Sequence, residues 1–247
     1  MIVMKRIIAL LAGTMMLASC MINFGGTNVM GYTEEGCDFS QERPMAAFDE
    51  INVAGAFNVY YIQSDESKVL VEGKEEFVEK VITELNDEAL TIKLEPGTYH
   101  NLVLKVTVYS PEVDEINVAG SGDFFDVAGH TSRSSIEYRL AGSGDLTLAA
   151  LSTKDDLEID LAGSGDVRAD GIVCKDLEIR LAGSGDIRID ATVENDIDAR
   201  INGSGDITLN GSCDKAELKI SGSGDMRGNL SYKKISTSCN GSGRISL

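Results

Sequence analysis

Six aspartates are the residues best placed to do chemistry, because each closes a copy of the same motif, Gly-Ser-Gly-Asp. If the copies stack, their carboxylates form a file that could bind Ca²⁺, which takes several oxygen ligands. The structural alternative is that each carboxylate caps its own corner by accepting backbone N–H bonds. Calcium-binding toxin rolls have a shorter period with more ligands per turn, so capping is favoured over calcium. The six are Asp123, Asp145, Asp166, Asp186, Asp206 and Asp225.

The spacing of the motif indicates the fold. Its first glycines stand 19 to 22 residues apart, and a seventh copy ends in Arg244, which predicts a positive charge over Asp225. A period near 20 is typical of a solenoid. Apolar and charged residues alternate on both sides of each copy, as in half-buried strands, although Asp126 and Gly228 fall in apolar columns. We therefore expect an all-β fold, a right-handed parallel β-helix with coils of about 20 residues. A hairpin meander would not explain why one corner recurs.

The two ends of the repeat differ in sequence. Residues 69 to 110 depart from the period, and five apolar residues there have the spacing of one helix face. They predict a short helix near residues 75–85 that covers the N-terminal end of the stack. The other end stops at Leu247, partway through a coil, and this uncapped end is expected to pair with another chain or with a copy of itself. The helical residues are Phe77, Val78, Val81, Ile82 and Leu85.

The first twenty residues have the order of a bacterial export signal. Lys5 and Arg6 precede an apolar run that is too short to span a bilayer. The following Leu-Ala-Ser-Cys sequence matches the lipobox of bacterial lipoproteins. It predicts cleavage before Cys20, lipidation of the Cys20 thiol, and tethering of the mature chain to a membrane.

Three segments follow from these patterns. We expect a lipoprotein signal peptide at residues 1–19, a flexible tether at 20–46 that is rich in glycine, and a single β-helix domain at 47–247. The formal net charge is -18, so nucleic acid and anionic membrane surfaces are poor partners.

The remaining reactive side chains give little sign of a catalytic or metal site. His100 and His130 have no recognisable acidic, Cys or His partner in the sequence. Cys174 and Cys213 fall two coils apart, roughly 9.6 Å, which is beyond the reach of a disulfide. We expect no disulfide within the helix and a free thiol at Cys37, which could cross-link copies of the chain.

Two further patterns concern one cysteine and the glycines of the repeat. Cys239 falls in an apolar column and is expected to be buried. Gly-Ser-Gly-Asp lacks the third glycine of a dinucleotide site and the lysine of a phosphate-binding loop, so a nucleotide site is excluded.

Several stretches together resemble one known family. The lipobox is followed by Ile-Asn-Val-Ala-Gly-Ala-Phe-Asn-Val at residues 51 to 59, Val-Thr-Val-Tyr-Ser-Pro at 106 to 111, and then the Gly-Ser-Gly-Asp copies. This order resembles the head GIN domain family of auto-transporter adhesins, common among Bacteroidetes lipoproteins, over about residues 46 to 247. The resemblance implies a β-helical domain exposed at the cell envelope and brings no catalytic residues.

The leading hypothesis is a non-enzymatic lipoprotein of the cell envelope, anchored at the outer membrane, which presents a rigid acidic face for adhesion to a protein or glycan. One alternative is a carbohydrate-active β-helix enzyme. The coils vary little in length and the chain has no Trp, so neither a walled cleft nor an indole platform for a sugar ring is expected. The other alternative is a calcium-stabilised scaffold.

Overall fold

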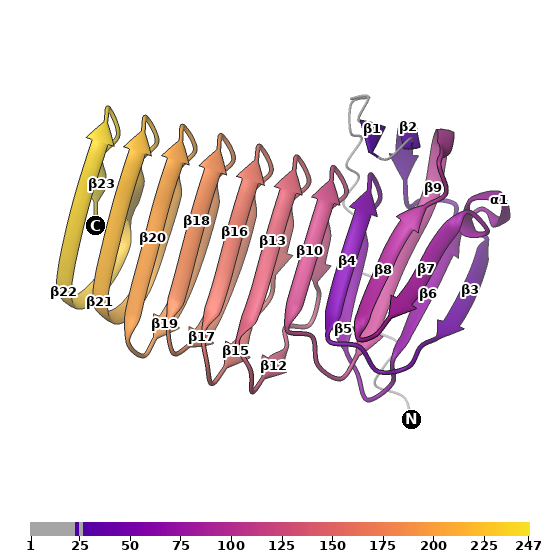
Figure 1. Ribbon diagram of the computed structural model, residues 1–247, viewed down its shortest axis with the longest axis horizontal. Helices are drawn as coiled ribbons and strands as arrows, with labels where there is room; N and C mark the ends of the chain where they lie inside the picture. The colour runs from indigo at the N-terminus through magenta and orange to yellow at the C-terminus, as the bar shows by residue number, and fades with distance from the viewer. Residues whose placement is uncertain (1–22, 25–26) are drawn as a thin grey trace.

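The computed structural model describes residues 23–24 and 27–247 and shows a parallel β-solenoid with coils about 20 residues apart (Figure 1). The predicted β-helix is therefore confirmed. The predicted signal peptide and the lipidation site, Cys20, lie outside the described residues. No helix in the described part of the chain is both long enough and apolar enough to cross a membrane.

One face of the solenoid consists of strands that lead into the Gly-Ser-Gly-Asp corner. They pair in parallel from one coil to the next, and each forms because apolar and polar residues alternate. These strands are β4 (Glu50–Gly55), β10 (Glu115–Gly120), β13 (Ile136–Gly142), β16 (Leu157–Gly163), β18 (Leu177–Gly183), β20 (Asp196–Gly203), and the second halves of β21 (Ile207–Gly222) and β22 (Met226–Gly241).

The strands that leave the corner form the second face and also pair in parallel. The first halves of β21 and β22 continue this face. The other strands that leave the corner are β5 (Val59–Gln63), β11 (Phe124–Asp126), β14 (Leu146–Leu148), β17 (Val167–Cys174), β19 (Ile187–Val193) and β23 (Ile245–Ser246). The short strands β12 (Thr131–Ser132) and β15 (Ser152–Thr153) follow β11 and β14 after a further turn and pair in parallel with each other.

The core is a set of apolar columns that run along the solenoid axis. Leu161 is in register with Leu181, which is in register with Ile201, and each is 1% exposed. Because side chains alternate between the two sides of a strand, one constant register keeps every column buried along the whole stack.

Close stacking of the corners explains their two glycines. Gly163 has a φ of 148°, a region that residues with a Cβ rarely adopt. A Cβ at either Gly163 or Gly165 would also overlap the carbonyl oxygen of the matching glycine one coil earlier. Both positions therefore require glycine.

The N-terminal end is covered by strands of mixed direction. β6 pairs antiparallel with β3 and β9, and β7 pairs antiparallel with β8, while β8 and β9 continue in parallel into the regular coils (Figure 1). The elements are β1 (Asn23–Phe24), β2 (Thr27–Thr33), β3 (Phe39–Pro44), β6 (Lys68–Gly73), α1 (Glu75–Val78), β7 (Val81–Asn86), β8 (Ala89–Leu94) and β9 (Gly97–Ser110).

The helix predicted near residues 75–85 is shorter than expected. Only α1 is helical, and the apolar residues from Val81 onward belong to β7, in which Val81 pairs with Leu94. The spacing also fits a strand whose β-branched residues gain a partner in β8, and this pairing outweighs the local helical pattern. The Arg43 guanidinium donates to the carbonyl oxygens of Val78 and Val81, at 2.9 and 2.7 Å, and so fixes the junction.

The flexible tether predicted for residues 20–46 is wrong for its second half. β2 pairs in parallel with β9, and β3 pairs antiparallel with β6. Gly31 and Gly36 have φ values of 82° and 84°, and they lie within β2 and in the turn that follows it rather than in a linker. The folded unit begins before residue 47.

Candidate functional site

The aspartate file connects one coil to the next. In each case Oδ1 of one aspartate accepts the backbone N–H of the equivalent aspartate in the following coil. The predicted capping role is correct in kind, but the bond crosses between coils instead of closing its own corner. The N···Oδ1 distances are 2.9 Å for Asp145–Asp123, 2.9 Å for Asp166–Asp145, 3.0 Å for Asp186–Asp166, 2.9 Å for Asp206–Asp186 and 2.8 Å for Asp225–Asp206.

The same corner holds a second, main-chain connection. The carbonyl oxygen of Asp166 accepts the N–H of Leu146 in the preceding coil at 2.8 Å. Each aspartate therefore bonds to the previous coil through both its N–H and its carbonyl oxygen. A hydrogen bond from N–H to an ionised carboxylate is stronger than one between neutral groups, and this offsets part of the repulsion between stacked aspartates.

The file begins at Asn58. Gly55 is in register with Gly120, so Gly55-Ala56-Phe57-Asn58 occupies the place of the motif in the first coil. Asn58 Oδ1 accepts the N–H of Asp123 at 3.0 Å, and Asn58 Nδ2 donates to Glu34 Oε1 at 2.8 Å. Sequence reasoning missed this role, although the match between residues 51 to 55 and 116 to 120 was the available signal.

Glu34 closes the N-terminal end of the file. Its carboxylate also accepts hydrogen bonds from the hydroxyls of Tyr32, at 3.1 Å, and Tyr60, at 2.9 Å. Burial, reinforced by the charge of Glu34, raises the pKa of both tyrosines. Burial also raises the pKa of Asp123, although its bond from the Asp145 N–H opposes that shift. This end of the file is thus its least hydrated part.

The C-terminal end of the file is closed by a backbone group. The N–H of Arg244 donates to Asp225 Oδ1 at 2.9 Å. The expected ion pair between Arg244 and Asp225 is not among the ion pairs of the described residues. The guanidinium of Arg227 contacts Asp206 instead. A main-chain donor is sufficient here, so the seventh copy does not need aspartate.

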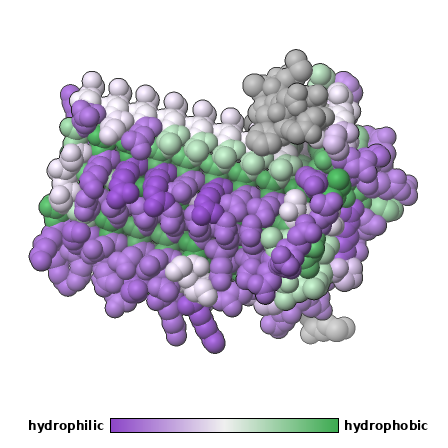
Figure 2. Space-filling view, viewed as in Figure 1, coloured by the Kyte–Doolittle hydropathy of each residue, from purple (hydrophilic) through white to green (hydrophobic). Residues whose placement is uncertain are grey.

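A second charged feature crosses the face of β10, β13, β16, β18, β20 and β21, where Figure 2 shows hydrophilic side chains beside a pale band of small residues. One outward column is wholly acidic: Glu115, Glu137, Glu158, Glu178, Asp198 and Glu217. The adjacent column is mostly basic: Asn117, Arg139, Asp160, Arg180, Arg200 and Lys219. The two columns form ion pairs along the sheet, such as Arg180–Glu178 at 2.7 Å.

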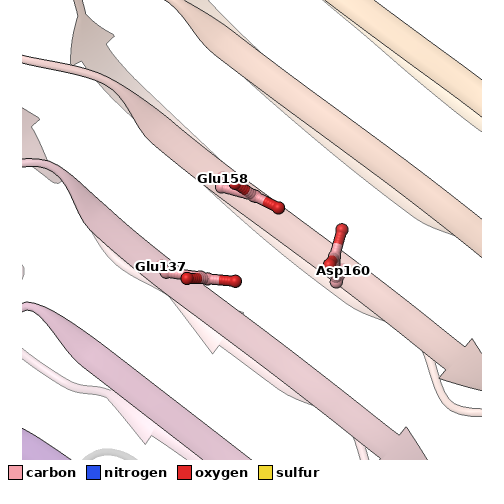
Figure 3. Close-up of side chains that lie close together, drawn as sticks. All are labelled: Glu137, Glu158 and Asp160. Atoms are coloured by element: carbon pink, nitrogen blue, oxygen red, sulfur yellow. The ribbon is translucent and has the colours of Figure 1, made fainter.

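Three carboxylates meet where Asp160 interrupts the basic column. Ligand atoms of Glu137, Glu158 and Asp160 lie within 4.8 Å of one another (Figure 3). Burial raises the pKa of Glu137 and of Asp160, and the charge of Arg139 acts against both shifts. Arg180 contacts both Glu158 and Asp160. Because two guanidinium groups already balance these carboxylates, the cluster is an ion-pair network with little remaining attraction for a metal ion.

The expectation that neither histidine has an acidic partner is wrong for His130. Its Nδ1 lies 2.6 Å from Asp126 Oδ2, and both side chains are completely buried. The Tyr61 ring meets the imidazole edge-on, with 5.4 Å between the ring centroids, and the centroid of the Tyr138 ring lies 6.5 Å from that of the imidazole. Asp126 was visible in the sequence as a polar residue in an apolar column. Both side chains are closed off from solvent, so the pair belongs to the interior and lies out of reach of a substrate.

The cysteines are placed by the same columns. Cys174 and Cys213 are buried free thiols, and burial raises the pKa of Cys174 to about 12, which makes its thiol unreactive. Cys37 is partly buried and also carries a free thiol. The expectation that Cys239 is buried is wrong, because no further strand covers this part of β22 in the described chain.

Several solved structures resemble this fold, and three of them come from Bacteroides and Parabacteroides. A "putative adhesin" from Bacteroides fragilis aligns with a TM-score of 0.76 and 22% identity over 84% of this chain and 95% of its own. A "putative lipid binding protein" from Parabacteroides distasonis gives a TM-score of 0.70 and 24% identity over 87% and 99%. A "putative adhesin" from the same organism gives 0.72 and 21% over 87% and 98%.

A comparison with curated proteins gives no significant match. The family model described as "putative auto-transporter adhesin, head GIN domain" matches residues 47–187, 134–213 and 157–247. These overlapping matches cover every regular coil, and they include each copy of the corner motif. The chain therefore belongs to the head GIN domain family of auto-transporter adhesins.

Proposed function

We propose that this protein is a non-catalytic binding module of the bacterial cell envelope, an adhesin anchored at the outer membrane through a lipid on Cys20. The main support is the corner edge, where exposed serines recur beside the aspartate file. A row of hydroxyls and carboxylates spaced by roughly 4.8 Å suits a ligand that itself repeats, such as a glycan or an extended polypeptide. The serines are Ser143, Ser164, Ser184, Ser204, Ser223 and Ser242.

The corner edge can be tested by substitution. The variant with Ser164→Arg, Ser184→Arg and Ser204→Arg places long side chains along the row. The matched control, with Ala128→Arg, Ala150→Arg and Val173→Arg, adds the same charge at exposed positions of the other corner. On glycan arrays and immobilised extracellular proteins, the serine variant loses the binding of the natural protein, and the control keeps it. Equal loss of binding in both variants would show that the corner edge is not the binding site.

The anchor has its own test. Incorporation of labelled palmitate into the natural protein, and its loss in Cys20→Ser, is the expected result. Protease treatment of intact cells then decides whether the domain is accessible from outside, as adhesion requires. A Cys20→Ser protein that keeps both the label and its membrane fraction would contradict the proposed anchor.

The alternatives of catalysis and calcium binding have less support. Asp Oδ1 is used along the file for a backbone N–H, which leaves each aspartate fewer oxygens for a cation. Release of reducing ends from a polysaccharide panel, abolished by Asp166→Asn, would favour an enzyme. A rise in melting temperature in millimolar Ca²⁺ against a chelator would favour the calcium scaffold.

A lipid ligand, which the description of one solved relative suggests, fits this chain less well. One pocket that is widely open to solvent lies next to α1, and three of its five lining side chains are acidic. The lining residues are Asp38, Phe39, Lys74, Glu75 and Glu76. An acyl chain would gain little from such a lining, because burial of charged groups against it is unfavourable.

A further inference from the structure

The outer edge of β22 is a long strand edge that the described chain leaves open. All of β22 pairs with β21, but on its other side only Met226 and Arg227 pair, with β23. From Ser231 to Gly241 every residue is exposed. An open edge presents a row of unpaired N–H and C=O groups, which is a template for an added strand.

The side chains of this strand differ from those of earlier coils. Where β21 has the buried residues Ala216, Leu218 and Ile220, β22 has exposed Ile235, Thr237 and Cys239 in register. Thr and Cys in these columns reduce the apolar surface at the end of the stack. A partner of this edge would therefore bury little apolar surface.

The charge of this region is opposite to that of the protein as a whole. Residues 226–247 contain Arg227, Lys233, Lys234 and Arg244 and no Asp or Glu, in a chain of net charge -18. Arg227 and Lys233 pair with Asp206 and Asp214 of the preceding coil. Lys234 and Arg244 have no such partner among the described residues, so their charges are free to attract an acidic ligand.

We propose that the β22 edge, defined as residues 228–241, binds an extended acidic segment of another protein by strand addition. The backbone of the segment pairs with β22, and its carboxylates lie against Lys234 and Arg244. Charge also decides against a second copy on the same edge, because a two-fold pairing of β22 with itself would bring lysines together. Lysine on an edge strand protects against self-association in the same way.

The test uses the purified natural protein and a fluorescent peptide in which Glu alternates with Val and Thr. Two further peptides serve as probes: one has Lys in place of Glu, and one carries N-methyl groups along the backbone, which block strand pairing. Fluorescence anisotropy is expected to show binding of the acidic peptide alone. Comparable binding of the Lys peptide or of the methylated peptide would overturn the proposal, and so would no binding at all.

Charge reversal at the edge provides the matched variants. Lys234→Glu with Arg244→Glu is expected to weaken binding of the acidic peptide roughly tenfold or more and to favour the Lys peptide. Lys74→Glu with Lys154→Glu makes the same change of charge away from β22 and is expected to leave the affinity unchanged. Equal losses in the two variants would overturn the proposal. Light scattering that shows dimers of the natural protein without peptide, lost in a variant with Pro within 228–241, would assign the edge to a second copy instead.

Discussion

The backbone N–H of Asp166 donates to Oδ1 of Asp145 at 2.9 Å, so a side chain of one coil is bonded to the main chain of the next. The same bond recurs along the file, and it explains how like charges can be stacked at the spacing of neighbouring strands. A fixed N–H donor takes the place of part of the water that would otherwise solvate each carboxylate. The aspartate of the repeat is therefore explained by stacking, independently of any ligand.

Replacement of Asp166 separates its hydrogen bond from its charge. In the natural protein the Asp186 N–H donates to Asp166 Oδ1 at 3.0 Å. Asp166→Ala removes this acceptor and is expected to lower the free energy of unfolding by about 1 to 2 kcal/mol. Asp166→Asn keeps an oxygen acceptor and removes repulsion within the file, so it is expected to be neutral or slightly stabilising. Urea unfolding measures both. Equal losses for Ala and Asn would mean that the charge, and not the acceptor, matters.

Asn58 provides a natural test of the same idea at the first coil. Asn58→Asp would keep the bond to the Asp123 N–H but turn the group facing Glu34 from a donor into a second carboxylate. We expect this variant to be less stable by about 1 to 3 kcal/mol. Glu34→Gln in the same chain should restore much of the loss, since an amide can donate to the new carboxylate. A double-mutant cycle by urea unfolding that shows no coupling would contradict the contact.

A glycine of the repeated corner should tolerate substitution less well than Gly171, which has more space beside it. Gly165→Ala would overlap the Gly144 carbonyl oxygen, and we expect a loss of roughly 3 kcal/mol or more because backbone on both sides must shift. Gly171→Ala meets nothing closer than 3.5 Å and pays only for its φ of 72°, about 1 kcal/mol. Thermal unfolding of the two variants gives the comparison, and similar melting temperatures would contradict the close stacking.

The regular coils can be predicted from the sequence because the same pattern of apolar, polar and glycine residues recurs in each coil. The columns of Leu161 and Leu181 follow from alternation and a constant period, and the structure confirms their register. The N-terminal cover could not be predicted in this way. Val81 has the spacing of a helix residue, and only pairing with Leu94 of β8 makes it part of a strand. Long-range partners of this kind leave no local signal.

The candidate site was predictable in its residues but not in its bonds. The aspartates were identified, yet nothing in one sequence states that Asp145 bonds to Asp166 of the next coil and not to its own corner. His130 was set aside because its partner, Asp126, counted only as an exception in an apolar column. Whether two such side chains meet depends on the direction in which each side chain points, and the spacing of the residues in the sequence does not determine that direction.

The pH dependence of stability should show the cost of burying Asp123. Burial raises its pKa in the folded protein, so the folded state holds this proton more tightly than the unfolded chain does. Between the ordinary carboxyl pKa of about 4 and the raised value, the unfolding free energy contributed by Asp123 therefore falls as the pH rises. Asp123→Asn is expected to flatten this slope in urea unfolding at pH 4 to 6. An unchanged slope would show that Asp123 is well hydrated.

The buried pair of Asp126 and His130 gives the last prediction. Asp126→Ala removes the one polar partner that the imidazole has among the described residues, and we expect a loss of roughly 3 to 5 kcal/mol in the free energy of unfolding, as for removal of one member of a buried pair. Asp126→Leu with His130→Phe replaces the pair by apolar groups and restores the column formed by Leu148. This double variant is expected to be as stable as the natural protein or more so, because both desolvation costs vanish. If the double variant loses as much as Asp126→Ala in urea unfolding, the pair is needed for the packing of this coil and not merely tolerated by it.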